Sequence, residues 1–164
     1  MAAKEKGLED LFLNTLKDIY YAEKQILRAL PKMAKAAESE ELREAFQTHR
    51  DETEGQIGRL EQVFEALGKK AQGKTCEAIK GLLEEGKEVM EDFEESDALD
   101  AGLIAAGQAV EHYEISRYGT LRTWAQELGL REAVGLLEET LEEEKRTDKL
   151  LSELAEARVN QKAA

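Results

Sequence analysis

The sequence has little cysteine, few aromatic residues and no long apolar run, and each shortage excludes a class of protein. Cys76 is the single cysteine. A disulfide framework within the chain and a thiolate-rich zinc or iron–sulfur site are excluded, because each needs several sulfur atoms. We expect Cys76 to be a small, partly buried apolar side chain. Aromatic residues make up 5% of the chain, against 41% hydrophobic and 36% charged residues, which is typical of a water-soluble helical domain rather than a β-sandwich or barrel.

Positive charge is also scarce. The 164 residues include 23 Lys and Arg against 36 Asp and Glu, which gives a formal net charge of −13. We expect no nucleic-acid partner, because such a chain repels phosphates unless its basic residues gather in one patch, and the sequence has no such patch. The apolar stretches are short and residues 1–6 lack an apolar signal core, so we expect a cytoplasmic protein with no membrane span.

The spacing of the apolar residues predicts an all-α protein, because these residues recur at the period of a helix almost throughout the chain. The five expected helices cover about residues 7–37, 39–67, 75–94, 97–129 and 130–158. Two long helices, a long crossover with a shorter helix, and two more long helices is the element order of a ferritin-like four-helix bundle. Pro31 should bend the last turns of the first helix. We expect one domain over residues 1–164.

Helix ends are marked by capping residues. Ser39, Thr75 and Asp97 are the expected N-caps of the second, third and fourth helices, because short polar side chains there accept a hydrogen bond from the first turn. Gly68 and Gly129 are the expected C-terminal glycines of the second and fourth helices.

Polar residues occupy positions that the apolar period assigns to the core. In the first helix, Glu23 has apolar residues one turn before and after it. A lone buried carboxylate is energetically costly, so Glu23 should be neutralised, paired or metal-bound. The corresponding polar positions in the other long helices are His49, Glu52 and Gln56, then Glu111 and Glu114, then Glu144 and Asp148.

A weak internal repeat relates these positions. Glu114 follows Glu23 by 91 residues, and Glu144 follows Glu52 by 92 residues. The two halves of the chain therefore resemble two helical hairpins. Side chains three or four residues apart lie about 4.5 to 6 Å apart along a helix axis, so the acids of both hairpins can converge near the middle of the bundle.

Converging carboxylates suit a pair of transition-metal ions, because a carboxylate can bridge two cations and an imidazole can complete the shell of one. The candidate ligands are Glu23, His49, Glu52, Glu111, Glu114, Glu144 and Asp148. The general pattern has a Glu-x-x-His motif on two of the helices, whereas here His49 precedes Glu52 and Asp148 stands where a second histidine is expected. The expected cofactor is two iron ions, with manganese or zinc as alternatives.

Several sequence runs resemble the YciE/YciF-type ferritin-like proteins of bacteria, from about residue 8 to residue 154. These runs are Ala22–Gln25, Ala29–Met33, Glu52–Gln56, Glu111–Ile115, Tyr118–Leu121, Glu142–Lys145 and Thr147–Asp148. The resemblance implies a dimeric bundle with a dinuclear metal centre and a link to stress responses. The Glu111-x-x-Glu114 spacing is also similar to rubrerythrins, which reduce peroxide at a di-iron centre. This chain lacks their cysteine-rich domain, so its unknown electron donor would be external.

Each polar residue also has a purely structural interpretation. A single carboxylate in such a seam is more often a helix-edge residue or an ion-pair partner than a ligand. His49 is a ligand, a bonded core histidine or a donor to Glu52, whereas Gln56 should be a hydrogen-bond partner and His112 should lie beside the site. The acids expected mostly to face solvent are Glu138, Glu139, Glu142 and Glu143. The tyrosines that either bond a ligand, donate an electron or pack in the core are Tyr20, Tyr113 and Tyr118.

Three functions remain open at this point. The first is a stress-related di-iron protein, an oxidase or peroxidase that oxidises Fe(II) with oxygen or peroxide. The second is an iron storage or sequestration protein, and the third is a metal-free structural or partner-binding bundle. A homodimer is expected mainly from the resemblance, and Ile79, Leu82 and Leu83 of the crossover either form its interface or cover one end of the bundle.

Overall fold

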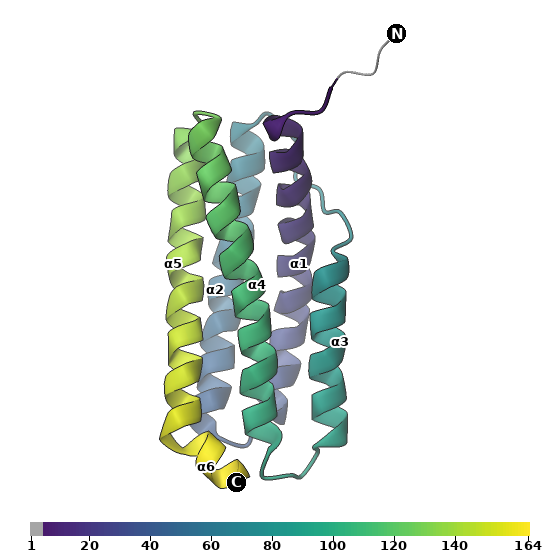
Figure 1. Ribbon diagram of the computed structural model, residues 1–164, viewed down its shortest axis with the longest axis vertical. Helices are drawn as coiled ribbons and strands as arrows, with labels where there is room; N and C mark the ends of the chain where they lie inside the picture. Colours follow the sequence, from purple (N-terminus) through teal and green to yellow (C-terminus); the bar gives the residue numbers. More distant parts are fainter. Residues whose placement is uncertain (1–4) are drawn as a thin grey trace.

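The computed structural model describes residues 5–164, and this part of the chain folds into helices without any strand (Figure 1). The elements are α1 (Leu8–Ala36), α2 (Glu40–Ala66), α3 (Glu77–Asp92), α4 (Leu99–Glu127), α5 (Arg131–Leu154), a π-helical turn (Ala155–Val159) and α6 (Asn160–Ala163). The predicted all-α fold is confirmed. Across residues 5–164, no helix has both the length and the apolar character that a membrane span requires.

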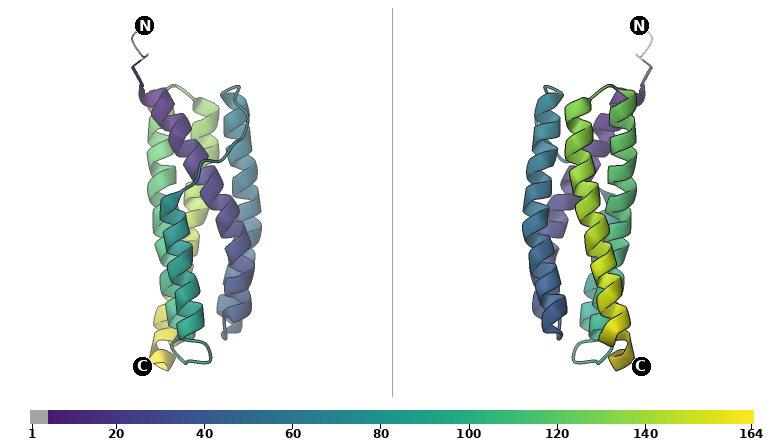
Figure 2. Two further views of the ribbon diagram at one scale, coloured as in Figure 1. Left: turned by 90° about the vertical axis from the view of Figure 1, so that its right-hand side faces the viewer. Right: turned by 90° about the vertical axis from the view of Figure 1, so that its left-hand side faces the viewer.

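The four long helices form the bundle. α1 packs against α2 and α4, and α5 packs against the same two helices. The α1–α2 and α4–α5 hairpins are antiparallel, and residues 67–98 join them by running along the bundle (Figures 1 and 2). This connection crosses α1, where the amide of Lys74 donates a 3.0 Å hydrogen bond to the carbonyl of Lys17. The predicted ferritin-like order, with a long crossover and a fifth helix, is confirmed.

α3 lies along the outside of α1 and α4. Ile79 is fully buried there, and Leu82 and Leu83 pack against the same apolar core. The close contact with α4 depends on Gly102, because a Cβ atom at that position would lie 2.5 Å from Cγ1 of Val89. Ile79 is therefore covered within the chain, whereas Leu82 and Leu83 stay partly exposed on the outer side of the bundle.

Three of the predicted helix ends are confirmed. The hydroxyl of Ser39 accepts a 3.3 Å hydrogen bond from the amide of Leu42 at the start of α2. Gly68 and Gly129 follow the ends of α2 and α4 with φ angles of +65° and +71°, a conformation in which glycine escapes the steric penalty of a Cβ atom.

Two of the predicted N-caps are wrong. α3 begins one residue later than Thr75 implies, because the Sγ atom of Cys76 accepts the hydrogen bond from the amide of Ile79, at 3.3 Å. α4 begins after Ala98, without a side-chain cap. Asp97 points to solvent instead and pairs with a lysine from the C-terminus.

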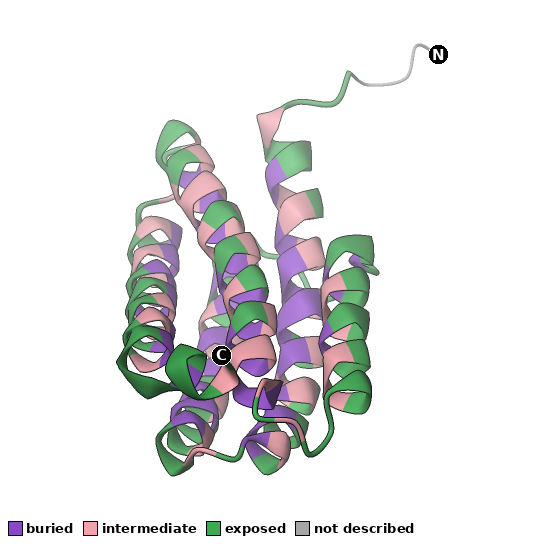
Figure 3. Cartoon of the chain, turned by 60° about the horizontal axis from the view of Figure 1, so that its bottom comes forward, coloured by how far each residue is buried: buried purple, intermediate pink, exposed green. Residues whose placement is uncertain are grey.

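The last helix changes course where a continuous helix to residue 158 is expected. α5 ends at Leu154, and the π-helical turn redirects the chain so that α6 lies across the base of the bundle (Figures 1 and 3). Lys162 of α6 reaches Glu38 at 2.7 Å and Asp97 at 3.3 Å. These ion pairs join the C-terminus to both loops at the base.

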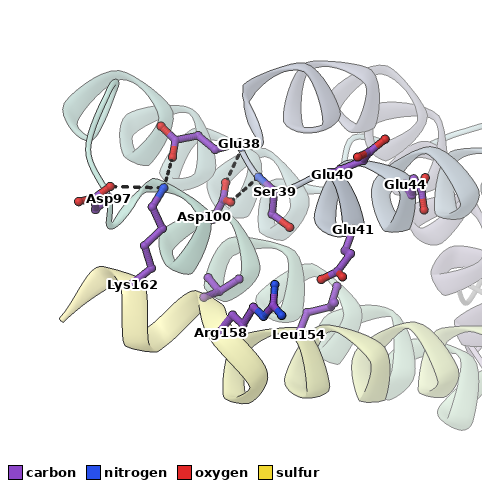
Figure 4. Close-up of a pocket in the computed structure, with 11 residues that line it drawn as sticks. Glu38, Ser39, Glu40, Glu41, Glu44, Asp97, Asp100, Leu154, Arg158 and Lys162 are labelled. Carbon is purple, nitrogen blue, oxygen red and sulfur yellow. Dashed lines mark hydrogen bonds and ion pairs between the residues drawn. The ribbon is translucent and has the colours of Figure 1, made fainter.

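Asp100 anchors the same end of the bundle from α4. Its two carboxylate oxygens accept hydrogen bonds of 2.8 Å from the amides of Glu38 and Ser39, just before α2 (Figure 4). The side chain is 6% exposed. An acid at this position suits the positive end of the α2 dipole, and it links the two helical hairpins.

Candidate metal centre

The interior of the bundle is apolar except for a polar layer to which all four long helices contribute. The buried polar residues of this layer are Glu23, His49, Thr53, Gln56, Glu111, Glu114, Thr140, Glu143 and Glu144. Charged side chains are rarely fully buried unless they are paired or bind a metal. This layer is therefore the candidate functional site of the bundle.

Four of these residues form one compact cluster. His49 of α2, Glu111 and Glu114 of α4, and Glu144 of α5 each offer one potential ligand atom, and these atoms lie within 4.8 Å of one another. Nε2 of His49 is 2.8 Å from Oε1 of Glu111 and 3.7 Å from Oε2 of Glu144. Glu111 and Glu114 point into the same volume because residues three apart share a helix face.

Glu23 of α1 lies beside this cluster. Its carboxylate accepts a 2.6 Å hydrogen bond from the hydroxyl of Tyr118, and neither side chain is exposed. Burial raises the pKa of Glu23, although its contacts with Glu114 and Tyr118 act in the opposite direction. Each of the four long helices thus supplies at least one residue at or next to the cluster.

The electrostatics of the cluster favour protonated side chains when no metal is bound. Burial raises the pKa of Glu114 and Glu144, and the neighbouring carboxylates raise it further. Burial favours the neutral form of His49, but the contacts with Glu111, Glu52 and Glu144 together outweigh it and raise the pKa of the imidazole. A metal ion that binds here therefore competes with protons.

Several polar atoms of the site have no hydrogen-bond partner. They are Oε2 of Glu23, Nε2 of His49, Oε2 of Glu111 and both carboxylate oxygens of Glu114 and of Glu144. Nε2 of His49 is close to Glu111, but the direction of this contact is not that of a hydrogen bond. Buried polar atoms in folded proteins are nearly always paired. The residues of the cluster therefore fit a metal ion, whose charge would satisfy these atoms.

Glu52 lies on the far side of the imidazole from the cluster. Its Oε2 atom is 3.3 Å from Nδ1 of His49 and 3.4 Å from the hydroxyl of Thr147, and its side chain is 30% exposed. The hydrogen bond to His49 lowers the pKa of Glu52. The contact at Nδ1 turns Nε2 of His49 towards the cluster, as in many histidine–metal sites. Glu52 therefore orients the imidazole ring.

Asp148 also lies outside the cluster. Its Oδ1 atom is 3.1 Å from Nε2 of His112 and accepts a 3.3 Å hydrogen bond from the amide of Gln108. Both partners project from α4 and hold Asp148 at the partly exposed edge between α4 and α5. His112 is exposed, beside the site and not in it.

Glu143 forms a buried ion pair next to the cluster, and the prediction that it faces solvent is wrong. This residue, expected to face solvent, is 9% exposed and bonds to Arg59 at 2.5 Å and to Gln56 at 3.0 Å. The reason is Arg59, which lies three residues after Gln56 and brings a cation to the same face of α2. The expected role of Gln56 as a hydrogen-bond partner is confirmed.

One of the three tyrosines bonds a candidate ligand. Tyr118 donates to Glu23, as described above. Tyr113 instead donates to Asp18 at 2.5 Å and lies 3.0 Å from Sγ of Cys76. Tyr20 donates to Glu61 on the surface.

This helical bundle, with its histidine and glutamates able to hold a metal ion at its centre, is a ferritin-like bundle protein. A family model described as a domain of unknown function, DUF892, matches residues 7–164. Protein YciF of Escherichia coli strain K12 is 52% identical over 159 residues, which is 96% of each chain. The chain belongs to this family, and the predicted resemblance to YciF-type proteins is confirmed.

Solved structures agree with this assignment. The crystal structure of the E. coli stress protein YciF matches with a TM-score of 0.90 and 52% identity, covering 95% of this chain and 99% of YciF. The YcfI protein of Rhodopseudomonas palustris, described with a proposed structural role, matches with a TM-score of 0.88 and 46% identity, covering 93% of this chain and 97% of that one. A protein from Xanthomonas campestris at 23% identity shares the fold, with a TM-score of 0.74 over 94% of each chain.

Proposed function

We propose that the cluster of His49, Glu111, Glu114 and Glu144, together with Glu23, binds two iron ions, and that the loaded protein oxidises Fe(II) with oxygen or peroxide. The observation that carries this proposal is the set of buried carboxylate oxygens and the imidazole nitrogen that have no partner. A metal-free core would leave these atoms unpaired or protonated, whereas two divalent cations would satisfy them together.

The redox chemistry comes from the metal pair, because two Fe(II) ions supply the two electrons that convert one H₂O₂ and two protons into two water molecules. The chain's own residues set the conditions for this reaction. Glu111, Glu114 and Glu144 provide negative charge in the buried core, and Glu52 holds the ring of His49 with Nε2 inward. Tyr118 donates a hydrogen bond of 2.6 Å to Glu23, so this pair can hold a proton at the edge of the site.

A stress-related role is supported by the relationship to YciF, which is described as a stress protein. A metal-free structural bundle is the second candidate, because the relative from R. palustris is described with a proposed structural role. The buried contacts among Arg59, Gln56 and Glu143 also favour it, since such a network can fix the register of two helices.

The experiment starts with the metal content of protein purified without chelator. Anaerobic titration with Fe(II), followed by peroxide or oxygen, is then recorded in the near ultraviolet. We expect saturation at about two ions per chain, the capacity of a dinuclear site, and a ferric absorption band. A much larger load would support storage, and no binding would support the structural bundle.

Two matched variants of α5 separate the site from nonspecific binding of cations. Glu144→Gln removes a buried carboxylate and should lower the iron bound at saturation from about two ions per chain to about one. Glu142→Gln removes an exposed carboxylate of the same helix, which pairs with Lys145 on the surface. This variant should bind iron like the unmodified chain. Equal loading of both variants would contradict the proposed site.

A further inference from the structure

A small cavity lies against the cluster, on the side of the bundle towards the base. Its accessible volume is about 20 Å³, and about 10 to 15 Å³ of such volume is enough for one water molecule. The cavity therefore has room for one molecule of two or three atoms. Its wall is formed mainly by apolar residues, among them Leu30, Met33, Phe46, Gly107, Val110 and Leu151.

Three polar residues complete the wall, namely His49, Glu111 and Thr147. Nε2 of His49 and Oε2 of Glu111 have no hydrogen-bond partner, but the surface that lines the cavity is almost entirely apolar. Nδ1 of His49 faces Glu52 at 3.3 Å, and the hydroxyl of Thr147 lies 3.3 Å from Nδ1 and 3.4 Å from Glu52. Nε2 of His49 and the carboxylate of Glu111 face the cluster.

The cavity is thus unsuited to water or peroxide. A buried water molecule typically makes about three hydrogen bonds, whereas apolar cavities stay dry and accept apolar molecules. Peroxide has two O–H groups that this wall cannot satisfy. Dioxygen is apolar and diatomic, so it loses no hydrogen bond on entering.

We propose that this cavity is a binding site for dioxygen, placed directly beside the metal cluster. Its wall includes two residues of the cluster, so a bound molecule lies next to the candidate ligands His49 and Glu111. The assignment of oxygen as the oxidant rests on the proposed function. The binding of an apolar gas by the cavity does not, because it depends on the wall alone.

Gly107 gives the cavity part of its space. It is buried in α4, one turn before Glu111. A Cβ atom at Gly107 would lie 3.4 Å from side-chain carbons of Leu151 and Phe46, and 3.9 Å from Cε of Met33. These are contacts with three other residues of the wall. Gly107→Ala therefore places a methyl group in the cavity at little steric cost, and alanine favours a helix over glycine.

The test uses the full chain without metal, with its methyl groups labelled for NMR. Spectra are compared under nitrogen and under oxygen, because paramagnetic dioxygen speeds the relaxation of methyl protons near its binding site. The methyls of Leu30, Val110 and Leu151 should relax several-fold faster under oxygen than those of Leu16 and Leu121, which are equally buried but lie elsewhere in the core. Equal enhancement at both sets would overturn the proposal.

Matched glycine variants on α4 locate the effect. Gly107→Ala should remove most of the extra relaxation. Gly119→Ala is the same chemical change in open space, since nothing lies within 4 Å of a Cβ atom there, and it should leave the relaxation unchanged. If Gly107→Ala keeps the enhancement, the proposed site is wrong. Val110→Ile adds a methylene group at another residue of the cavity wall. It is the second variant if Gly107→Ala does not fold.

Iron-loaded protein then separates this proposal from the proposed function. Gly107→Ala should slow the oxidation of Fe(II) by oxygen several-fold and leave the oxidation by peroxide unchanged. Enhancement in the methyl spectra together with no iron binding would refute the proposed function and leave the gas site standing. Iron binding without any enhancement would refute the gas site alone.

Discussion

Tyr118 donates a hydrogen bond of 2.6 Å to Glu23, and both side chains are fully buried at the edge of the cluster. Two facing helices, α1 and α4, are joined by this bond between a phenol and a carboxyl group, as they also are by the bond from Tyr113 to Asp18. The bond from Tyr118 is the single side-chain hydrogen bond that Glu23 makes within residues 5–164, since the second oxygen of Glu23 has no partner.

Removing the phenol should destabilise the chain without metal. Tyr118→Phe leaves both oxygens of Glu23 without a hydrogen-bond donor in the buried core, which should lower the free energy of unfolding by about 1 to 3 kcal/mol. Unfolding in urea measures the loss. Tyr20→Phe is the matched control, because Tyr20 is also buried but its partner Glu61 lies at the surface. A loss no larger than that of the control would show that the bond contributes little.

The orientation of His49 should depend on Glu52. Glu52→Ala removes the contact at Nδ1, so the ring can turn Nε2 away from the cluster. We expect metal affinity to fall by about 10- to 100-fold, as when other such partners of ligand histidines are lost. Calorimetric titration with Mn(II) or Fe(II) tests this. Glu54→Ala, an exposed acid on the same helix, should bind like the unmodified chain, and equal affinity of the two variants would count against the orienting role.

The stability of the chain without metal should fall as the pH rises from about 5 to 8. In the folded state the pKa of Glu23, Glu114 and Glu144 is raised above the ordinary value of 4.5. The folded state then binds more protons than the unfolded state above that value, and linkage makes stability decrease with pH. The raised pKa of His49 acts in the same direction.

Melting temperatures at several pH values check this expectation. A double variant, Glu114→Gln with Glu144→Gln, removes two of the groups responsible and should flatten the decline. Saturating divalent cation should reverse it, because the deprotonated carboxylates then bind metal. A melting temperature of the metal-free chain that rises steadily over this range would contradict the assignment of protons to the cluster.

Asp100 should stabilise the base of the bundle independently of the metal. Asp100→Ala leaves the amides of Glu38 and Ser39 without their acceptor and should lower the free energy of unfolding by about 1 to 3 kcal/mol. Metal affinity should not change, because Asp100 lies near the base of the bundle, away from the cluster. Asp97→Ala, a change at an exposed neighbour that pairs with Lys162, should cost less than about 1 kcal/mol. Chemical unfolding of the two variants distinguishes these effects.

Most of the fold could be predicted from the sequence, because helices depend on local spacing. The predicted helices of residues 39–67 and 97–129 correspond to α2 and α4, with ends that differ by one or two residues. The departure at the C-terminus has a different cause. α6 turns across the base because Lys162 meets Glu38 and Asp97, residues far from it in sequence, and no local pattern contains that information.

The sequence predicts which helical turns supply the polar layer, but it does not predict which side chains of that layer enter the cluster. The repeat makes Glu52 the counterpart of Glu144, yet Glu144 is fully buried in the cluster and Glu52 is at the edge. His49 lies inside because Glu52 and Thr147 bind the outer nitrogen of its ring.

The sequence by itself determined the helical class, the order of the helices and the height at which acids enter the core, since all three follow from the spacing of apolar and polar residues along the chain. The tertiary structure alone decided which of these acids meet. Successive residues on a helix point about 100° apart, so a side chain at the edge of a seam can turn to either side. Glu144 turns inward, Asp148 turns to His112, and Glu143 turns to Arg59, because neighbouring helices place the partners that fix each direction.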